Sequence, residues 1–248
     1  MMHKRLAIFL VAMIAICSCE KNPYDGGIDT YITDKGEKVV ITCIKHNTFQ
    51  ITYKGKEYQI DPVSSAYRPI TNYTQRNKAD YIIVTHEHYD HFDMHAIFLL
   101  TKGTTNILLP PRCYGRYQRG IVIRNGEQAQ LDDSITLYAV PAYNTTEKYR
   151  LLHPKGYGNG YILDLEGFRI YIAGDTEPIP EMKLIKDIDI AFLPCEKPKT
   201  MSPKQLRQVA KLIKPKVVYP CHMGQTDQNA IKKALSGLGI DVKMRMMK

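Results

Sequence analysis

Four residues able to bind a metal ion follow one another closely after a short apolar segment. Residues 81–84 are apolar and rich in β-branched side chains, which predicts a buried strand. The turn that follows carries His86, His88, Asp90 and His91. Imidazole nitrogen and carboxylate oxygen are the ligands that Zn²⁺ and similar divalent ions prefer. A loop at the end of a strand can turn the first two histidines toward one ion and the Asp-His pair toward a second. The pattern therefore predicts a metal site.

The same arrangement, an apolar strand followed by a polar residue, recurs along the chain. Strands are expected at 38–45, 48–53, 57–61, 106–109, 134–140, 161–165, 168–173, 188–193 and 217–219. Helices are expected over 93–100, after residue 202 and over 230–238. Because loops at one edge of a scaffold can converge, we expect Asn144, Asp175 and His222 to meet the histidine-rich turn. Helices interleaved with two groups of strands predict an α/β fold of two packed sheets with helices outside.

The H-x-H-x-D-H run placed directly after an apolar strand resembles the metallo-β-lactamase-fold superfamily of metal-dependent hydrolases. The resemblance implies a four-layer αββα sandwich, with two mixed β-sheets and helices on the outer faces. It also implies that Asp175, in the segment YIAGDT, bridges two ions, and that His222, in VVYPCHMG, completes the second site. The implied ligands are His86, His88 and Asp175 for the first site, and Asp90, His91, Asp175 and His222 for the second.

One ligand of the family pattern is missing. A third histidine of the first site is expected after a strand in the middle of the chain, where this sequence has Asn144. An amide oxygen is a poorer ligand for Zn²⁺ than an imidazole. His153, in LLHPKGYGNG, lies one loop further on and is a candidate replacement. The sequence leaves open a weaker first site, a recruited His153, or a single ion.

Two earlier residues match family positions that lie beside the metal floor. His46 follows the first of three expected N-terminal strands, and Asp61 follows the third. Each is either a metal ligand or hydrogen-bond partner of one, or an ordinary turn residue.

The resemblance implies hydrolysis with two divalent cations as cofactors, with zinc as the expected ion and Mn, Fe or Ni as alternatives. A water shared by two cations loses a proton near neutral pH, and the resulting hydroxide would attack an ester, lactone, amide or phosphodiester. Asp90 is the expected catalytic residue, since it would orient the hydroxide and later pass on a proton. By its Ala-Tyr-Asn and His-Pro-Lys-Gly segments the chain is most similar to the branches of ascorbate-6-phosphate lactonase and of N-acyl phosphatidylethanolamine phospholipase D.

Two other functions are compatible with the same fold. The first is a non-catalytic envelope lipoprotein, derived from a hydrolase, that binds a metal or an anion in its cleft; the asparagine at position 144 favours it. The second is an iron-dependent redox protein. Di-iron members of the superfamily typically carry glutamate where this chain has His88, which argues against iron.

The N-terminus is predicted to be a lipoprotein signal peptide. A short basic start precedes an uninterrupted apolar run over residues 6–16, which is too short to span a bilayer as a mature helix. The run ends in Cys17-Ser18-Cys19, which resembles a bacterial lipoprotein processing site. Cys19 is the expected lipidation residue because a small residue precedes it. The expected boundaries are 1–18 for the signal peptide, 19–28 for a tether and 29–248 for a single hydrolase domain.

These features predict a protein of the bacterial cell envelope, facing the periplasm or on the outer membrane, that contacts the membrane only through its lipid. The chain holds 34 Lys and Arg against 25 Asp and Glu, a net charge of +9, which favours an anionic small-molecule or lipid-derived substrate. No dense basic block with interleaved aromatics appears, so nucleic acid is not expected. The cations that could hold a phosphate or carboxylate are Lys148, Arg150, Lys155, Lys197 and Lys199.

Overall fold

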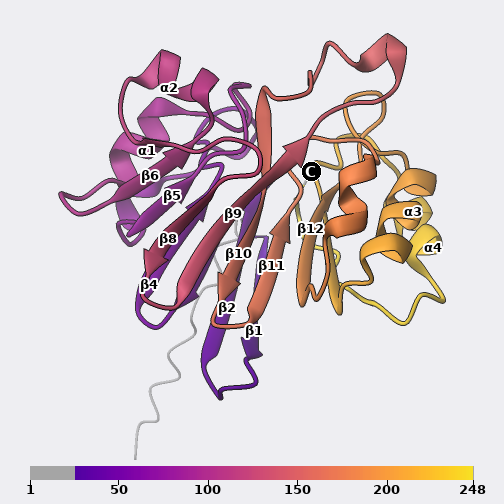
Figure 1. Cartoon of the computed structure of the whole chain (residues 1–248), viewed down its shortest axis with the longest axis horizontal. Coiled ribbons are helices and arrows are strands. Elements are labelled where there is room, and N and C mark those ends of the chain that lie inside the picture. Colours follow the sequence, from indigo (N-terminus) through magenta and orange to yellow (C-terminus); the bar gives the residue numbers. More distant parts are fainter. Residues whose placement is uncertain (1–25, 248) are drawn as a thin grey trace, which may run out of the picture.

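The computed structural model describes residues 26–247, and two seven-stranded sheets lie face to face at its centre (Figure 1). The first sheet contains, in spatial order, β1 (Gly27–Ile32), β2 (Lys38–Lys45), β3 (Thr48–Tyr53), β4 (Lys56–Ile60), β5 (Tyr81–Ile83), β6 (Asn106–Leu109) and β7 (Ile121–Val122). Strands β1 to β4 pair antiparallel, and β4 to β7 pair parallel.

The second sheet repeats this organisation. Its strands, from one edge to the other, are β14 (Asp241–Val242), β13 (Val217–Cys221), β12 (Ile190–Pro194), β11 (Phe168–Ile172), β10 (Gly158–Leu165), β9 (Ile135–Ala142) and β8 (Gln128–Asp132). Strands β8 to β11 pair antiparallel, and β11 to β14 pair parallel. The predicted fold of two mixed sheets is confirmed.

Helices cover the outer faces of both sheets, which makes the fold an αββα sandwich (Figure 1). The helices are α1 (Met94–Leu100), α2 (Pro111–Tyr117), α3 (Pro203–Ile213) and α4 (Gln228–Leu235), with 3-10 turns at Tyr73–Gln75, Glu147–Tyr149 and Pro180–Leu184. Helix α1 packs its buried residues on β5 and β6 of the first sheet, whereas α3 packs on the core that the second sheet shares with the first.

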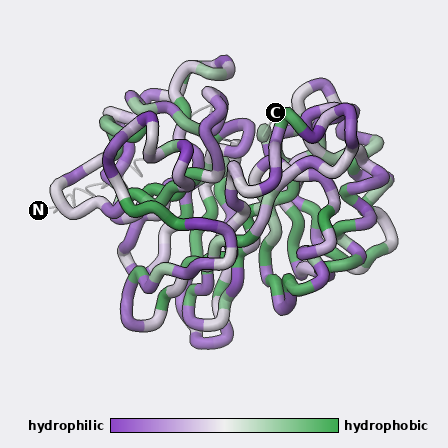
Figure 2. The backbone as a smooth tube through the Cα atoms, turned by 45° about the horizontal axis from the view of Figure 1, so that its top comes forward, coloured by the Kyte–Doolittle hydropathy of each residue, from purple (hydrophilic) through white to green (hydrophobic). Residues whose placement is uncertain are grey.

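Apolar and aromatic side chains of both sheets fill the space between them. Phe49 of β3 stacks on Phe192 of β12 with ring centroids 3.6 Å apart, so the two sheets interlock through stacked rings at this point. Figure 2 shows the same division, with hydrophobic segments running through the strands and hydrophilic ones along the outer loops. The strands are held rigidly, which allows the loops at their ends to be placed precisely.

Local sequence explains where α3 begins and how it faces the core. Ser202 and Gln205 form a capping box, in which each side chain satisfies a backbone N–H of the other, and Pro203 occupies the first turn. Leu206, Val209, Ala210 and Ile213 form the buried face. Helix α4 ends earlier than the sequence predicted, at Leu235, because Ser236 is extended and Gly237 follows with a φ of 70°.

Several elements differ from the sequence expectation. Strand β1 begins at Gly27, inside the segment 19–28 that was expected to be a tether; its alternating, half-exposed residues carry little apolar signal, and pairing with β2 orders them. Strands β7, β8 and β14 and helix α2 were not expected at all. The predicted signal peptide and the lipidation residue Cys19 lie outside the described residues. Within residues 26–247, no helix combines the length and the apolar character needed to cross a membrane.

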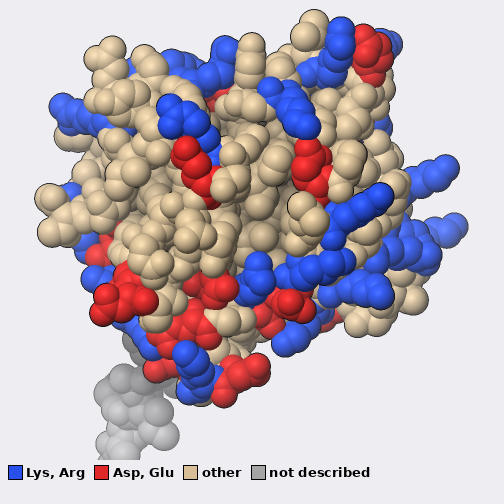
Figure 3. All heavy atoms as spheres, in the orientation of Figure 1, with Lys and Arg blue, Asp and Glu red and all other residues tan. Residues whose placement is uncertain are grey.

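The charged side chains are distributed unevenly over the surface. On the face shown in Figure 3, Lys and Arg gather over the side that carries α3 and α4, and acidic side chains gather at the opposite, lower end of the sheets.

Candidate metal centre

The candidate ligands all lie in loops that follow strands at one edge of the sandwich. His46 follows β2, the turn 86–91 follows β5, and Asp175 and His222 follow β11 and β13. His153 lies in the long connection between β9 and β10. Both sheets therefore contribute residues to one site, as the recurring strand-then-polar pattern predicted.

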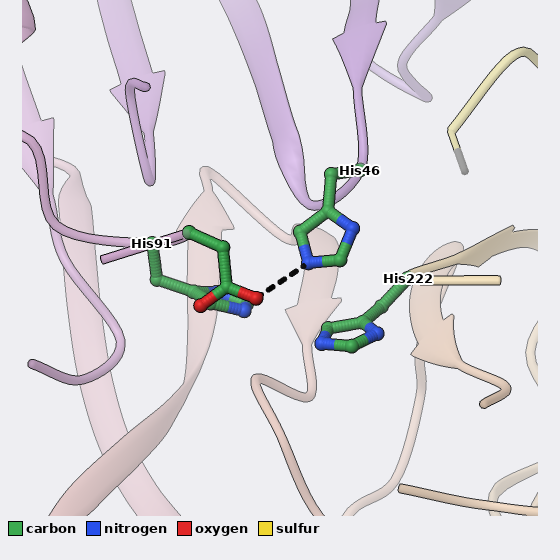
Figure 4. A group of neighbouring side chains, drawn as sticks. His46, His91 and His222 are labelled. Atoms are coloured by element: carbon green, nitrogen blue, oxygen red, sulfur yellow. Dashed lines mark ion pairs between the residues drawn. The ribbon is translucent and has the colours of Figure 1, made fainter. Parts of the chain in front are cut away.

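One group of ligand-type atoms is buried. We call His46, Asp90, His91 and His222 the buried cluster; one nitrogen or oxygen of each lies within 4.8 Å of those of the others. Figure 4 shows its three imidazoles converging from separate loops, with a dashed line for the 3.4 Å contact between His46 Nε2 and Asp90 Oδ2. His46, which the sequence left as ligand, partner or turn residue, belongs to this group.

A second group lies beside the first and reaches the surface. We call His86, His88, His153 and Asp175 the open cluster; their ligand-type atoms also lie within 4.8 Å of one another. His86 Nε2 is 3.0 Å from His88 Nδ1, and His153 Nε2 is 3.1 Å from Asp175 Oδ2. His88 is partly exposed, whereas the other three are buried.

Asp175 lies between the two clusters. Its Oδ2 is 3.0 Å from Nε2 of His222, and its Oδ1 is 3.4 Å from Nε2 of His91, so the carboxylate also touches two members of the buried cluster. Oδ1 has no hydrogen-bond partner although it is buried. A buried carboxylate with one unsatisfied oxygen is costly unless a positive charge faces it.

The orientation of the histidines fits metal binding. His91 Nδ1 lies 2.8 Å from Asp61, His222 Nδ1 lies 2.8 Å from Glu196, and His153 Nδ1 donates to the carbonyl of Lys199 at 3.1 Å. In each of these three residues Nε2 faces Asp175, at 3.4 Å for His91, 3.1 Å for His153 and 3.0 Å for His222, and it is buried there without an aligned hydrogen bond. Such orphaned nitrogens are rare and destabilising in a folded protein, and a divalent cation would satisfy them.

Asn144 uses its two nitrogens to hold neighbouring loops, and its Oδ1 is buried without a hydrogen-bond partner. Its Nδ2 donates to the carbonyls of Lys199 at 2.8 Å and Tyr149 at 3.3 Å, and its backbone N–H donates to the carbonyl of His153 at 2.9 Å. Asn144 therefore holds the loop that carries His153. Of the three possibilities that the sequence left open, the structure brings His153 to the open cluster.

Asp61 holds a ligand-type residue and is not part of either cluster. Its carboxylate is fully buried and accepts hydrogen bonds from Thr85 N–H at 2.7 Å, Thr85 Oγ1 at 2.6 Å and Asn47 Nδ2 at 2.8 Å, in addition to its contact with His91.

Three residues of the site have a left-handed backbone conformation: His46, Asp61 and His222 have φ values of 51°, 41° and 45°. Left-handed backbone at three non-glycine residues requires support from the surrounding structure, and it commonly marks functional sites.

Two residues that the sequence analysis missed contact the buried cluster. Glu196 lies two residues after the end of the apolar strand β12, so the signal used for the other residues was present there as well. Gly224 lets it approach His222, because a Cβ at that position would lie 2.2 Å from Glu196 Oε1. Tyr67 donates its hydroxyl hydrogen to Asp90 Oδ2 at 3.0 Å, and it lies in a loop with no local pattern that points to the site.

Neighbouring groups stabilise the charged forms of Asp175, His222 and His91. Burial opposes ionisation of Asp175, but His222 and His91 hold its pKa well below the usual value. Burial also opposes protonation of His222, yet Asp175 and Glu196 raise the pKa of this imidazole to about 10. The pKa of His91 is raised as well, because Asp175 and Asp61 outweigh burial. These residues form a charged network when no cation is bound.

His46, His86 and His88 favour the neutral form, which is the form that binds metal. Burial, aided by repulsion from His222, lowers the pKa of His46 to about 4. Burial and the neighbouring His91 lower the pKa of His86 well below its usual value. Burial, with a smaller contribution from His153, also lowers the pKa of His88.

A pocket opens onto the open cluster. It is lined by Leu152, Pro154 and Tyr157 together with His86, His88, His153 and Asp175.

The cations expected to hold an anionic group are largely committed elsewhere. Ion pairs join Arg150 to Glu147, Lys155 to Glu181, Lys197 to Glu177 and Lys199 to Glu196, and Lys148 lies over the ring of Tyr149. Neighbouring carboxylates thus neutralise four of these cations, and the fifth, Lys148, contacts an aromatic ring.

Comparison with known proteins identifies the family. Residues 40–222 match the model described as a Beta-lactamase superfamily domain. A metal-dependent hydrolase of Ligilactobacillus salivarius is 32% identical over 189 residues, which span 73% of this chain and 84% of that protein. A crystal structure from Parabacteroides distasonis, assigned as a metal-dependent hydrolase, has a TM-score of 0.86 and 43% identity, and the match covers 90% of this chain and 99% of that one.

A metallo hydrolase from the archaeon Ignicoccus hospitalis has a TM-score of 0.69 and 25% identity, with 85% of this chain and 96% of that one covered. The family match over residues 40–222 includes every candidate ligand from His46 to His222. The chain therefore belongs to the metallo-β-lactamase superfamily, among its metal-dependent hydrolases.

Proposed function

We propose that the chain uses two divalent cations, with zinc expected, to hydrolyse an ester, lactone, amide or phosphodiester. The buried cluster and the open cluster would each hold one cation, and Asp175 would contact both. The observation that carries this proposal is the position of Asp175 between the two clusters, with unsatisfied nitrogens of His91, His153 and His222 facing inward. When bound, such cations lower the pKa of water and polarise the group under attack.

Asp90 is proposed as the catalytic residue and as a ligand in the buried cluster. Burial opposes its charge, but His46 and His91 hold its pKa below the usual value, so the carboxylate stays ionised. It can therefore accept a hydrogen bond from an attacking water and orient that water. His46 would act as a further ligand, while Asp61 and Glu196 would orient the imidazoles of His91 and His222.

The pocket above the open cluster is the proposed substrate entrance, because His88 is the partly exposed member. Aromatic and aliphatic walls suit a small molecule or a lipid-derived one with an apolar part. Contacts between Asn144 and the His153 loop support the lactonase-like or phospholipase D-like branch, since the two segments typical of that branch act as one unit. They also weaken the case for a non-catalytic module, because His153 supplies the ligand that Asn144 lacks.

A hydrolysis screen with zinc-reconstituted protein tests the reaction class. The panel should contain lactones, phosphodiesters, esters and amides, and the control variants are Asp90→Ala and His88→Ala with their folds checked by circular dichroism. We expect turnover of at least one class, lowered at least about 100-fold in both variants. A variant with the wild-type rate would show that its residue is wrongly assigned, and an absorption band after aerobic purification would point to iron.

The number of cations per chain tests the second part of the proposal. We expect two equivalents of zinc by elemental analysis of the reconstituted protein. A single tightly bound equivalent would rule out a mechanism that needs two.

We further propose attachment to the bacterial cell envelope through lipid at Cys19, with no nucleic acid as partner. The basic start, the apolar run over 6–16 and the Cys17-Ser18-Cys19 sequence support this proposal. Expression of the full chain and of Cys19→Ser, followed by membrane fractionation, tests it. We expect the wild type in the membrane fraction and the variant in the soluble fraction, and an identical distribution of the two would refute lipid attachment.

A further inference from the structure

A buried lysine stands next to the metal-binding region without contacting either cluster. Lys45, only 6% exposed, ends β2 immediately before His46. Its Nζ donates to the carbonyls of Ser64 at 2.6 Å, Tyr67 at 3.0 Å and Pro69 at 3.2 Å. An ammonium group has three hydrogens, and here each finds a carbonyl of the same loop. Lys45 therefore ties the loop over residues 62–71 to the end of β2.

That loop delivers Tyr67 to the buried cluster. The phenol ring stacks on the imidazole of His46, with centroids 4.3 Å apart and planes inclined by 28°. The hydroxyl group donates to Asp90 Oδ2 at 3.0 Å. One side chain thus contacts two members of the cluster, each in a different way.

His46 has particular need of such a contact. His91 and His222 each have one nitrogen held by a carboxylate, from Asp61 and Glu196. His46 has only a 3.4 Å contact between its Nε2 and Asp90, and neither of its ring nitrogens makes a hydrogen bond. Since that one long contact leaves the ring weakly oriented, packing must hold it, between the stacked face of Tyr67 and the ring of His222, whose centroid lies 3.9 Å away.

We propose that Lys45 and Tyr67 are positioning residues for the cation in the buried cluster. Lys45 fixes the loop, the Tyr67 ring fixes His46, and the Tyr67 hydroxyl group fixes Asp90. This inference rests on the proposed function, because it assumes that the buried cluster binds a cation. It goes further by making the affinity of one cluster depend on two residues that never touch the ion.

Calorimetric titration of the metal-free full chain with zinc tests the role of Tyr67. Tyr67→Phe keeps the ring and loses the hydroxyl group, so we expect one of the two affinities to fall about 10-fold. Tyr67→Ala loses both contacts, and Lys45→Met releases the loop, so we expect about 100-fold for each, within the range known for residues that orient ligands. The other affinity should not change. Tyr89→Phe is the matched control, because Tyr89 adjoins Asp90 in the sequence but is 68% exposed.

A merely structural role would lower the thermal stability of the variants and leave both zinc affinities intact. Wild-type affinities in folded Tyr67→Phe and Tyr67→Ala would therefore overturn the proposal for Tyr67. Failure of the wild-type chain to bind any cation would instead refute the proposed function itself.

Hydrogen exchange of the metal-free protein tests the role of Lys45 independently. The amide of Thr71 donates to the Ser64 carbonyl at 3.0 Å, and the amide of Ser64 donates to Asp93 at 2.9 Å. In Lys45→Met we expect both amides to exchange at least about 10-fold faster, because the released loop opens locally. In Tyr67→Phe we expect both to exchange at the wild-type rate. Unchanged exchange in Lys45→Met would overturn the role of Lys45. If that variant does not fold, the Tyr67 variants decide whether the loop positions the cluster.

Discussion

The buried cluster and the open cluster have similar ligand types but different surroundings. In the buried cluster, carboxylates hold the imidazoles of His91 and His222. In the open cluster, His153 is held by a backbone carbonyl, and Thr85 Oγ1 lies 3.0 Å from His86 Nδ1. An imidazole held by a carboxylate is oriented more firmly and is more basic than one held by a neutral group. The buried cluster is thus the more firmly assembled group, and under the proposed function the open cluster is the half that substrate would reach.

The largest effect is expected from replacing Asp175, the residue that contacts both clusters. In Asp175→Asn, the neutral amide no longer offsets the repulsion between two cations, so we expect zinc affinity to fall at both clusters and turnover to fall at least about 1,000-fold. Zinc titration and the rate of the best substrate from the screen measure this. The matched control is Asp164→Asn, a half-buried carboxylate of β10 outside both clusters. Unchanged affinity at one cluster would show that Asp175 serves only the other.

Two substitutions should distinguish the cation bound by the buried cluster from the one bound by the open cluster. We expect His153→Ala and His222→Ala each to retain one equivalent of zinc and to lower turnover at least about 100-fold. Because the buried cluster is more firmly assembled, His222→Ala should lose the tighter equivalent and His153→Ala the weaker one, as measured by competition with a chelator. Loss of the same equivalent in both variants would contradict the division into two clusters.

A smaller effect should come from a residue that only orients a ligand. Asp61→Asn weakens the hold on His91, so we expect the affinity of the buried cluster to fall about 10- to 100-fold while that of the open cluster is kept. Zinc titration provides the measurement. Glu57→Gln is the control. Glu57 is a buried carboxylate of β4, the strand that ends just before Asp61, and it accepts hydrogen bonds from Gln50 and Asn77 and not from a histidine. Equal losses in both variants would indicate general destabilisation.

A separate effect should appear in the pH dependence of stability. The pKa of His222 is raised to about 10, so its contribution to folding is complete below the unfolded value of about 6.5 and is lost as the pH rises toward 10. For His222 alone this shift corresponds to a fall of about 4 kcal/mol in the free energy of unfolding of chelator-treated protein between pH 6 and pH 9.5. Urea titrations at the two pH values measure it.

The same titrations on two other samples complete this test. Zinc-loaded protein should show little of the fall, because a cation replaces the proton. His222→Gln should show a smaller fall than the wild type, because the imidazole is absent while His91, whose pKa is also raised, still contributes. His86 and His88 have lowered pKa values, so their contribution changes in the opposite direction and is the same in the wild type and in His222→Gln. An equal fall in all three samples would assign it to other groups.

Much of the fold and part of the site followed from local sequence patterns. The bounds of β2, β3 and β6 were predicted to the residue, and the change from apolar strand to polar loop located the turn 86–91, Asp175 and His222. Such signals are local, since burial of a strand and exposure of the next loop show within a few neighbouring residues. Half-exposed strands such as β1 and β8 have no such signal and were missed.

The amino-acid sequence by itself determined the kinds of ligand available and the ends of strands at which they stand, because both depend on residue type and on hydrophobic period. Only the tertiary structure decided that His153 joins the open cluster while Asn144 supports its loop, and that His46, Glu196 and Tyr67 meet at the buried cluster. These contacts join loops far apart in the chain. Whether they meet depends on how the two sheets pack and on which loops that packing brings to a common edge. A local sequence pattern carries no information about contacts between segments so far apart in the chain.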